Sequence, residues 1–104
     1  MIYEATFRVS DKLHARPICN LVILNNRYEK IYPGIAFNLK ILSGRFSDIF
    51  FDNLRSFSDL DSCRNQYNGE SVKLTASGDY SKEILTDCVK NLSNLLINSS
   101  CETF

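Results

Sequence analysis

The chain has 104 residues, the length of one domain, and 44% of them are hydrophobic, enough for a single core. Twelve basic residues balance twelve acidic ones, which excludes the strong positive field of a dedicated nucleic-acid binder. No apolar run approaches the ~18 residues that a membrane span needs. The first residues show no signal-peptide pattern, so we expect one domain over residues 1–104, cytoplasmic and without membrane insertion.

The first part of the chain predicts a strand followed by a helix. Residues 2–9 alternate between apolar and polar side chains, which is typical of a half-buried strand. A helix is expected to begin near Pro17, because proline is well tolerated at the first helical position, and to end by residues 25–27. Its apolar stripe consists of Ile18, Leu21 and Val22, widened by Cys19 and Ile23.

A long hairpin is expected over residues 35–51. Residues 35–41 alternate, a turn is expected at residues 43–45, and residues 46–51 are rich in aromatic and β-branched side chains. The strands could run for ~7–8 residues, longer than the ~5–6 typical of globular sheets. Phe46, Phe50 and Phe51 then either form an exposed apolar patch or enlarge the core, and the pattern leaves both alternatives open.

The second half predicts two more helices and one more strand. A short helix is expected over residues 53–62 after an Asn53 cap, and a strand over residues 71–77. Ser81 is a plausible N-cap for the most amphipathic helix of the chain, and the tail over residues 98–104 is expected to fray. The order β-α-β-β-α-β-α predicts an α+β fold, with a four-stranded antiparallel sheet covered on one face by three helices.

The four cysteines, at positions 19, 63, 88 and 101, form no CxxC pair, and the chain has one histidine. This spacing argues against a zinc site, so we expect no metal, no cofactor and four reduced thiols. Cys19 and Cys88 are expected to be buried on apolar helix faces.

The single histidine, His14, lies directly before the first predicted helix. No Ser, Thr, Asp or Asn stands at positions 14–16 to cap that helix, so the backbone N–H groups of Arg16, Ile18 and Cys19 are expected to lack a side-chain acceptor. Such a helix end attracts anions, and the Arg16 guanidinium suits phosphate. A neutral imidazole in this position is suited to accepting a phosphoryl group and passing it on. No second titratable catalytic group is apparent nearby, which favours transfer over hydrolysis.

The motif Leu-His-Ala-Arg-Pro at residues 13–17 resembles the active-site motif of HPr, the histidine-containing phosphocarrier of the bacterial phosphoenolpyruvate-dependent sugar phosphotransferase system. Residues 6–9 resemble the first strand of that family, residues 72–78 its last strand, and residues 53–56 its regulatory segment. The predicted βαββαβα order is that of the family's open-faced sandwich.

The resemblance implies a phosphocarrier, a protein substrate of enzymes that is not itself an autonomous catalyst. His14 would take phosphate on Nδ1 from Enzyme I, Arg16 would stabilise it, and the A component of a sugar Enzyme II would accept it. Ser56 would be the regulatory site for an ATP-dependent HPr kinase. The alternative is an HPr-like regulatory binding module, which would act through Ser56 or His14 without feeding sugar uptake.

The chain departs from the family pattern near the motif and in the second helix. Lys12 stands where the family usually has glycine, and the 35–51 hairpin region is longer than usual. Ser58, Asp59 and Asp61 occupy a surface that is mostly apolar in the family. The acidic second helix favours the regulatory alternative.

Overall fold

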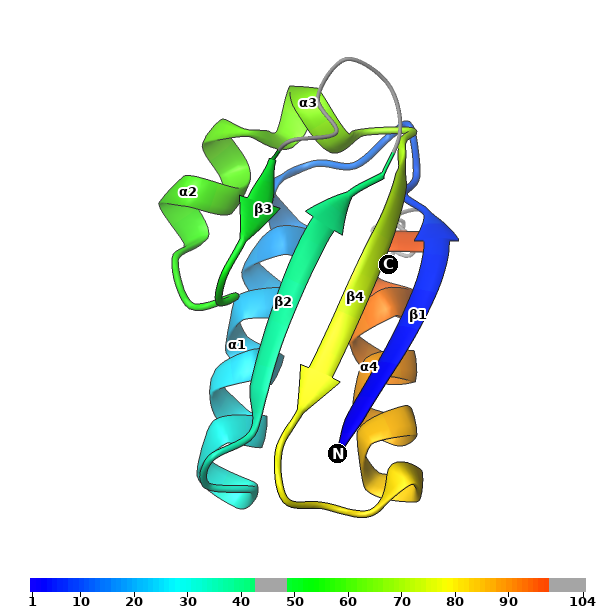
Figure 1. Ribbon diagram of the computed structural model, residues 1–104. Coiled ribbons are helices and arrows are strands. Elements are labelled where there is room, and N and C mark those ends of the chain that lie inside the picture. The colour runs from blue at the N-terminus through cyan, green and yellow to red at the C-terminus, as the bar shows by residue number, and fades with distance from the viewer. Residues whose placement is uncertain (43–48, 98–104) are drawn as a thin grey trace.

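The protein is an α+β open-faced sandwich, described by a computed structural model for residues 1–42 and 49–97 (Figure 1). The elements in chain order are β1 (Ile2–Arg8), α1 (Ala15–Ile31), β2 (Ala36–Ile41), β3 (Phe50–Phe51), α2 (Phe57–Ser62), α3 (Arg64–Tyr67), β4 (Ser71–Ser77) and α4 (Lys82–Ile97). The four strands form one antiparallel sheet in the order β1-β4-β2-β3. The predicted fold class is confirmed, and the architecture is compatible with an HPr-like sandwich.

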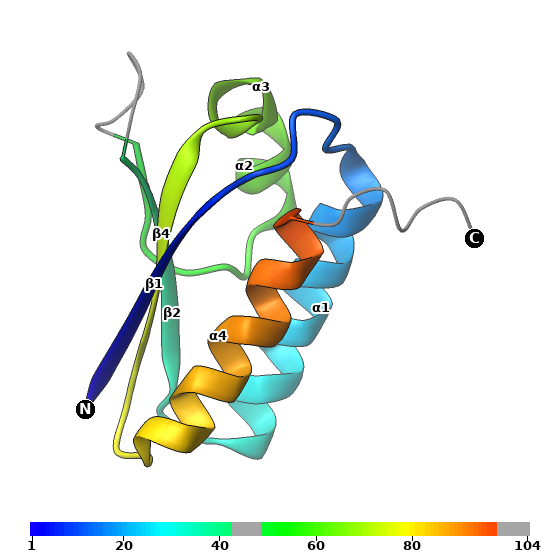
Figure 2. The same cartoon turned by 90° about the vertical axis from the view of Figure 1, so that its right-hand side faces the viewer.

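The helices α1 and α4 lie side by side across one face of the sheet, as Figure 2 shows. The alternation that predicted the strands separates the two faces. The helix-side residues of the two central strands are at most 1% exposed: Phe37, Leu39 and Ile41 on β2, and Val72, Leu74 and Ala76 on β4. Burying one such aliphatic or aromatic side chain stabilises the fold by about 1.5–3 kcal/mol.

The helix α1 continues to Ile31, so the prediction that it would end at residues 25–27 is wrong. Asn25 is fully buried, and its side-chain amide donates a hydrogen bond to Glu29 Oε2 at 3.0 Å, one turn further along the helix. Because its side chain is held by a partner four residues ahead, Asn25 does not compete for the backbone and the helix passes through it. The helix ends before Pro33 and Gly34, where Gly34 has φ of 89°.

The buried stripe of α1 is narrower than predicted. Ile18, Leu21 and Val22 are buried, but Ile23 is 50% exposed and Cys19 is also exposed. The expectation that Cys19 is a core residue is therefore wrong, because neither the sheet nor α4 covers that side of α1. Cys88 on α4 is buried as expected.

The helix α2 begins at Phe57, four residues later than predicted, and Asn53 does not cap it. The Asn53 Oδ1 atom accepts a hydrogen bond from the Arg55 N–H at 3.1 Å, which makes a local turn in place of a helix start. Ser56 is the N-cap, since its Oγ accepts from the Asp59 N–H at 3.3 Å. The short helix α3 follows α2 directly and was not predicted.

The two phenylalanines of β3 lie on opposite faces of the sheet. Phe50 is 51% exposed, whereas Phe51 is 9% exposed and its ring meets the Tyr67 ring edge-on, with ring centroids 5.8 Å apart. Phe51 therefore enlarges the core, whereas Phe50 is exposed. The strand β2 has six residues, shorter than expected. The predicted turn at 43–45 and Phe46 lie outside the described residues.

The remaining expectations concern α4 and the thiols. Ser81 caps α4 as predicted, because its Oγ accepts a hydrogen bond from the Ile84 N–H at 3.3 Å. Cys19, Cys63 and Cys88 form no disulfide, while Cys101 and the tail over residues 98–104 lie outside the described residues. In the described part of the chain, no helix has both the length and the apolar character needed to cross a membrane.

Candidate functional site

His14 is the N-cap residue of α1, at the end of the segment that connects β1 to that helix (Figure 1). Its backbone is extended, with φ of −132° and ψ of −172°. Leu13 before it is 5% exposed and Pro17 after it is buried, whereas Ala15 and Arg16 are exposed. The motif is therefore held by its two apolar residues, and His14 itself is half-buried between them and the exposed Ala15 and Arg16.

Backbone hydrogen bonds fix the connecting segment to two distant parts of the chain. The Val9 N–H donates to the Glu70 carbonyl at 3.0 Å, and the Gly69 N–H donates to the Ser10 carbonyl at 3.3 Å. The Ser10 N–H donates to the Leu96 carbonyl in the last turn of α4, also at 3.0 Å. The segment that presents His14 is thus anchored to the turn before β4 and to α4.

The His14 side chain folds back onto the start of its own helix. Its Nδ1 atom accepts a hydrogen bond from the Arg16 N–H at 3.3 Å. An imidazole nitrogen accepts a hydrogen bond through its lone pair, so the Nδ1 lone pair is directed at the Arg16 N–H. The expectation that no side chain caps this helix end is wrong, because the histidine itself is the cap.

The backbone amides at the helix end also differ from those predicted, because α1 begins two residues earlier than Pro17. Because α1 begins at Ala15, the N–H groups of Ile18 and Cys19 belong to its regular ladder, with the carbonyls of His14 and Ala15 as their partners. The amides at the positive end are those of Ala15 and Arg16, since Pro17 has no N–H. Of the three predicted anion-binding amides, Arg16 alone lies at the helix terminus.

The electrostatics of this end favour an anion. The first turn of α1 contains no acidic residue, so no carboxylate offsets the positive end of the helix dipole. The exposed Arg16 adds a full positive charge in the same turn. The exposed Asp11 and Lys12 in the preceding segment contribute opposite charges. An incoming phosphate would meet backbone N–H donors and one guanidinium.

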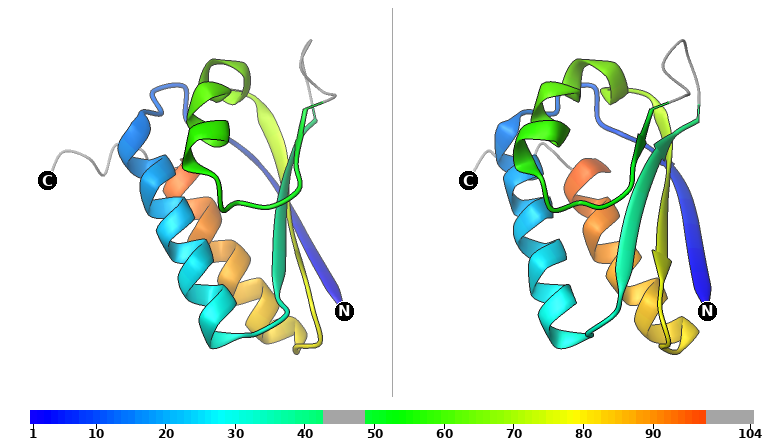
Figure 3. Two further views of the ribbon diagram at one scale, coloured as in Figure 1. Left: turned by 90° about the vertical axis from the view of Figure 1, so that its left-hand side faces the viewer. Right: turned by 60° about the vertical axis from the view of Figure 1, so that its left-hand side comes forward.

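Ser56 is the N-cap of α2, whereas His14 is the N-cap of α1. Figure 3 shows α2 beside α1, and the segment before α2 is tied to α1 by an ion pair between Arg55 Nε and Glu29 Oε1 at 3.0 Å. Glu29 is about 20 Å along the helix axis from Ala15. The ion pair therefore ties the segment before α2 to the second half of α1, and the Ser56 hydroxyl contacts Ser58 and Asp59 of its own helix.

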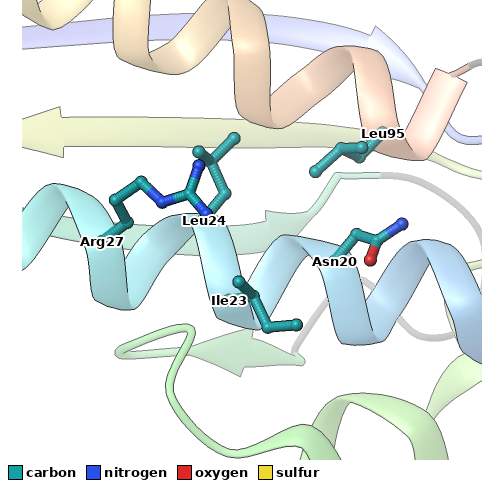
Figure 4. A pocket seen from close by; sticks show the side chains of 5 residues that line it. All are labelled: Asn20, Ile23, Leu24, Arg27 and Leu95. Carbon is teal, nitrogen blue, oxygen red and sulfur yellow. The ribbon is translucent and has the colours of Figure 1, made fainter.

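A shallow depression between α1 and α4 was missed by the sequence patterns (Figure 4). It has a volume of about 240 Å³ and is lined by Asn20, Ile23, Leu24, Arg27 and Leu95. Asn20 is about 9 Å along the helix axis from His14, so a protein that reached the histidine could also contact this depression. The signal in the sequence was Ile23, whose apolar side chain was assigned to the core.

The buried Tyr67, the last residue of α3, is structural. The Tyr67 hydroxyl donates to the Leu60 carbonyl at 2.6 Å, and burial raises the pKa of this phenol far above its ordinary value of 10.0. Within residues 1–42 and 49–97, no three His, Cys, Asp or Glu side chains are grouped closely enough to hold a metal ion.

Comparison with known proteins adds no family assignment: no protein-family model matches the chain, and neither does any curated protein.

Proposed function

We propose that this protein is a phosphocarrier, in which His14 Nδ1 accepts a phosphoryl group from phospho-Enzyme I and passes it to the A component of a sugar Enzyme II. The observation that carries the proposal is the hydrogen bond that His14 Nδ1 accepts from the Arg16 N–H in the first turn of α1. Enzyme I and the Enzyme II A component are proposed as partners because residues 13–17 resemble the HPr active-site motif. Such partners would place the protein in the cytoplasm.

The transfer step needs one nucleophile and one anion site. The Nδ1 lone pair forms a bond to the phosphorus atom of the donor, and the leaving atom of the donor keeps the electron pair of the bond that breaks. The Arg16 N–H, which now donates to Nδ1, would then donate to a phosphate oxygen instead. The Arg16 guanidinium would offset the remaining negative charge. Passage to the acceptor is the same step in reverse.

The contact surface for both partner proteins would be the exposed side of α1 next to α2. It offers the exposed Ile23 and the partly exposed Phe57, at 37%, with Arg27 beside them on α1. A partner that contacted these residues would bury apolar surface beside the helix that His14 caps. This is the kind of small interface expected for a protein that must release each partner quickly.

A regulatory binding module is the second candidate function. The observation that favours it is the first turn of α2, where Asp59 follows the Ser56 cap and Ser58 Oγ lies 3.4 Å from Ser56 Oγ. This polar, acidic turn suits recognition by a different partner and opposes docking on an acidic surface. In this version Ser56 would be the substrate of an HPr kinase, and phosphorylation would control binding without feeding sugar transport.

The decisive experiment is phosphorylation with phosphoenolpyruvate and purified Enzyme I. We expect the wild-type chain to acquire one acid-labile, base-stable phosphate, and the His14→Asn variant to acquire none. Omitting Enzyme I is the control for direct chemistry. Failure to label the wild-type chain with an Enzyme I that labels another HPr would overturn the proposal. Transfer onward to Enzyme IIA, together with a sugar-uptake assay, separates the carrier from the regulatory module.

A further inference from the structure

The strand β1 forms one edge of the sheet (Figure 1). It pairs with β4 over all seven of its residues, and no described strand pairs with its other side. Residues Ile2–Arg8 contain no proline or glycine to interrupt pairing. A regular edge strand of this length is a template for adding another strand.

The hydrogen bonds at the two ends of β1 fix which residues face the open edge. The Val9 N–H donates to Glu70, and the Met1 carbonyl accepts from Gly78. Since hydrogen-bonded pairs recur every second residue in an antiparallel ladder, the odd-numbered residues of β1 bond to β4. The backbone N–H and C=O groups that point to the open edge are those of the even-numbered residues Ile2, Glu4, Thr6 and Arg8.

The helix-side residues of β1 are less well covered than those of the central strands. Tyr3, Ala5 and Phe7 are only partly buried, whereas their register partners on β4 are fully buried. Ile2, on the other face, is 65% exposed. A strand added at this edge would cover apolar surface on both faces as well as satisfy backbone groups.

We propose that this edge binds β1 of a second copy of the chain in an antiparallel pairing, with the two-fold axis at Thr6. A symmetric pairing must place even-numbered residues opposite even-numbered residues, which leaves a small set of registers. With the axis at Thr6, Glu4 lies opposite the second copy's Arg8, and the symmetry repeats this pair. With the axis at Ala5 or at Phe7, Glu4 lies opposite Thr6 or Ser10, and the opposite charges do not meet.

The apolar face selects the same register. With the axis at Thr6, Ala5 lies opposite Phe7 of the second copy, so a small side chain meets a large one at each of two equivalent positions. These odd-numbered residues form the non-hydrogen-bonded pairs, in which side chains approach most closely. An axis at Phe7 would place two phenylalanine rings directly opposite each other, and an axis at Ala5 would pair two alanines.

The charges that would pair are accessible in the single chain. Glu4 is half exposed, and its carboxylate is 3.4 Å from the Lys73 ammonium, which is a surface ion pair of small value. Arg8 is exposed, and its Nε donates to the Gly69 carbonyl at 2.9 Å. The second copy would thus add a charge partner at modest cost.

The pairing would not compete with the proposed phosphocarrier surface. The strand β1 lies at one edge of the sheet, and β3 lies at the other, next to α2 (Figure 1). Phe57 at the start of α2 is therefore remote from the new interface. The inference does not depend on the proposed function, and its failure would leave that function untouched.

The first test combines sedimentation equilibrium with amide hydrogen exchange over a range of protein concentrations. We expect a monomer–dimer equilibrium, with the amides of Glu4, Thr6 and Arg8 gaining protection as concentration rises. The amides of Ala5 and Phe7, which already bond to β4, should change little. A chain that stays monomeric into the millimolar range overturns the proposal, and so does a dimer in which the even-numbered amides of β1 gain no protection.

The second test is a charge exchange. Glu4→Arg and Arg8→Glu should each weaken the dimer at least tenfold, because each places like charges opposite one another. The double variant restores both pairs across the axis and should recover dimerisation. Lys40→Glu on β2 is the matched control, since it changes a charge on the same sheet face away from the edge. Failure of the double variant to recover the dimer would overturn the register.

Discussion

His14 Nδ1 accepts a hydrogen bond from the Arg16 N–H at 3.3 Å, so the one histidine of the chain is both the candidate nucleophile and the cap of the helix that follows. These two roles use the same lone pair. Phosphorylation would therefore exchange a neutral cap for an anionic one at the same amides, and an anion is the better partner for a helix N-terminus.

The dual role predicts that His14→Ala and His14→Asn differ in stability but not in activity. Alanine removes the cap and should lower the free energy of unfolding by about 0.5–2 kcal/mol, whereas asparagine is a good cap and should restore most of it. Neither side chain can take up phosphate. Urea unfolding of the three proteins measures the difference. Equal stability of the alanine and asparagine variants would show that the cap contributes nothing.

Arg16 is expected to stabilise the bound phosphoryl group without being essential. Arg16→Ala should slow phosphotransfer from Enzyme I by about tenfold to a hundredfold, because a hydrogen bond to a charged group is worth about 1.5–3 kcal/mol. Lys90→Ala removes a positive charge on the exposed side of α4 and is the matched control. Rates from quenched single-turnover labelling decide the matter. Identical phosphotransfer rates for Arg16→Ala and Lys90→Ala would show that Arg16 does not contact the phosphoryl group.

The strands could be predicted because one face of the sheet is buried and the other is not. Apolar residues such as Phe37, Leu39 and Ile41 therefore alternate with polar ones along the strand. The helix ends could not be predicted in the same way. Asn25 looks like a terminator in a sequence, and only the Glu29 side chain one turn ahead, together with burial, allows the helix to continue. The bond to Glu29 is local, but the burial of Asn25 depends on tertiary packing, which the local pattern does not show.

The candidate site was half predictable for a related reason. The motif and its position before a helix located His14, but capping preferences favour Ser, Thr, Asp and Asn, so a histidine cap was not expected. Because His14 is the cap, α1 begins two residues earlier than expected and exposes the amides of Ala15 and Arg16. The exposure of Ile23 was likewise hidden, because an apolar residue beside a helix stripe looks the same whether or not a neighbouring element covers it.

The two phenylalanines of β3 should respond very differently to substitution. Phe51→Ser removes a buried ring that packs against Tyr67 and should cost about 3–5 kcal/mol in the free energy of unfolding. Phe50→Ser changes a half-exposed ring and should cost about 1 kcal/mol or less. Thermal unfolding of both variants provides the comparison. Similar melting temperatures for the two would contradict the assignment of faces.

Tyr67 predicts a loss of stability at alkaline pH. Burial raises the pKa of its hydroxyl in the folded chain above the ordinary value of 10.0. At a pH between the ordinary and the raised pKa, the folded chain therefore holds a proton that the unfolded chain has released. Its contribution to stability is therefore complete below about pH 10 and declines as the pH rises further. Tyr67→Phe should flatten this decline and should cost about 1–3 kcal/mol at neutral pH, because the Leu60 carbonyl loses its donor. Urea midpoints at several pH values test both effects. An unchanged alkaline slope would argue against a buried phenol.

Ser56 combines a structural role with the regulatory one that the resemblance implies, and two substitutions separate them. Ser56→Ala removes the α2 cap and should cost about 0.5–2 kcal/mol, whereas Ser56→Asp supplies an equivalent cap and should leave stability nearly unchanged.

If Ser56 is regulatory, Ser56→Asp should still slow phosphotransfer from Enzyme I to His14, because it adds a negative charge next to the docking residue Phe57. The slowing should be smaller than that caused by phosphate, which carries more charge, and smaller still at high salt. Arg55, beside the cap and bound to Glu29, would partly offset the added charge. Ser56→Ala is the matched control for any effect of the lost hydroxyl. A wild-type transfer rate in Ser56→Asp, with no labelling of Ser56 by HPr kinase and ATP, would leave this serine with its capping role alone.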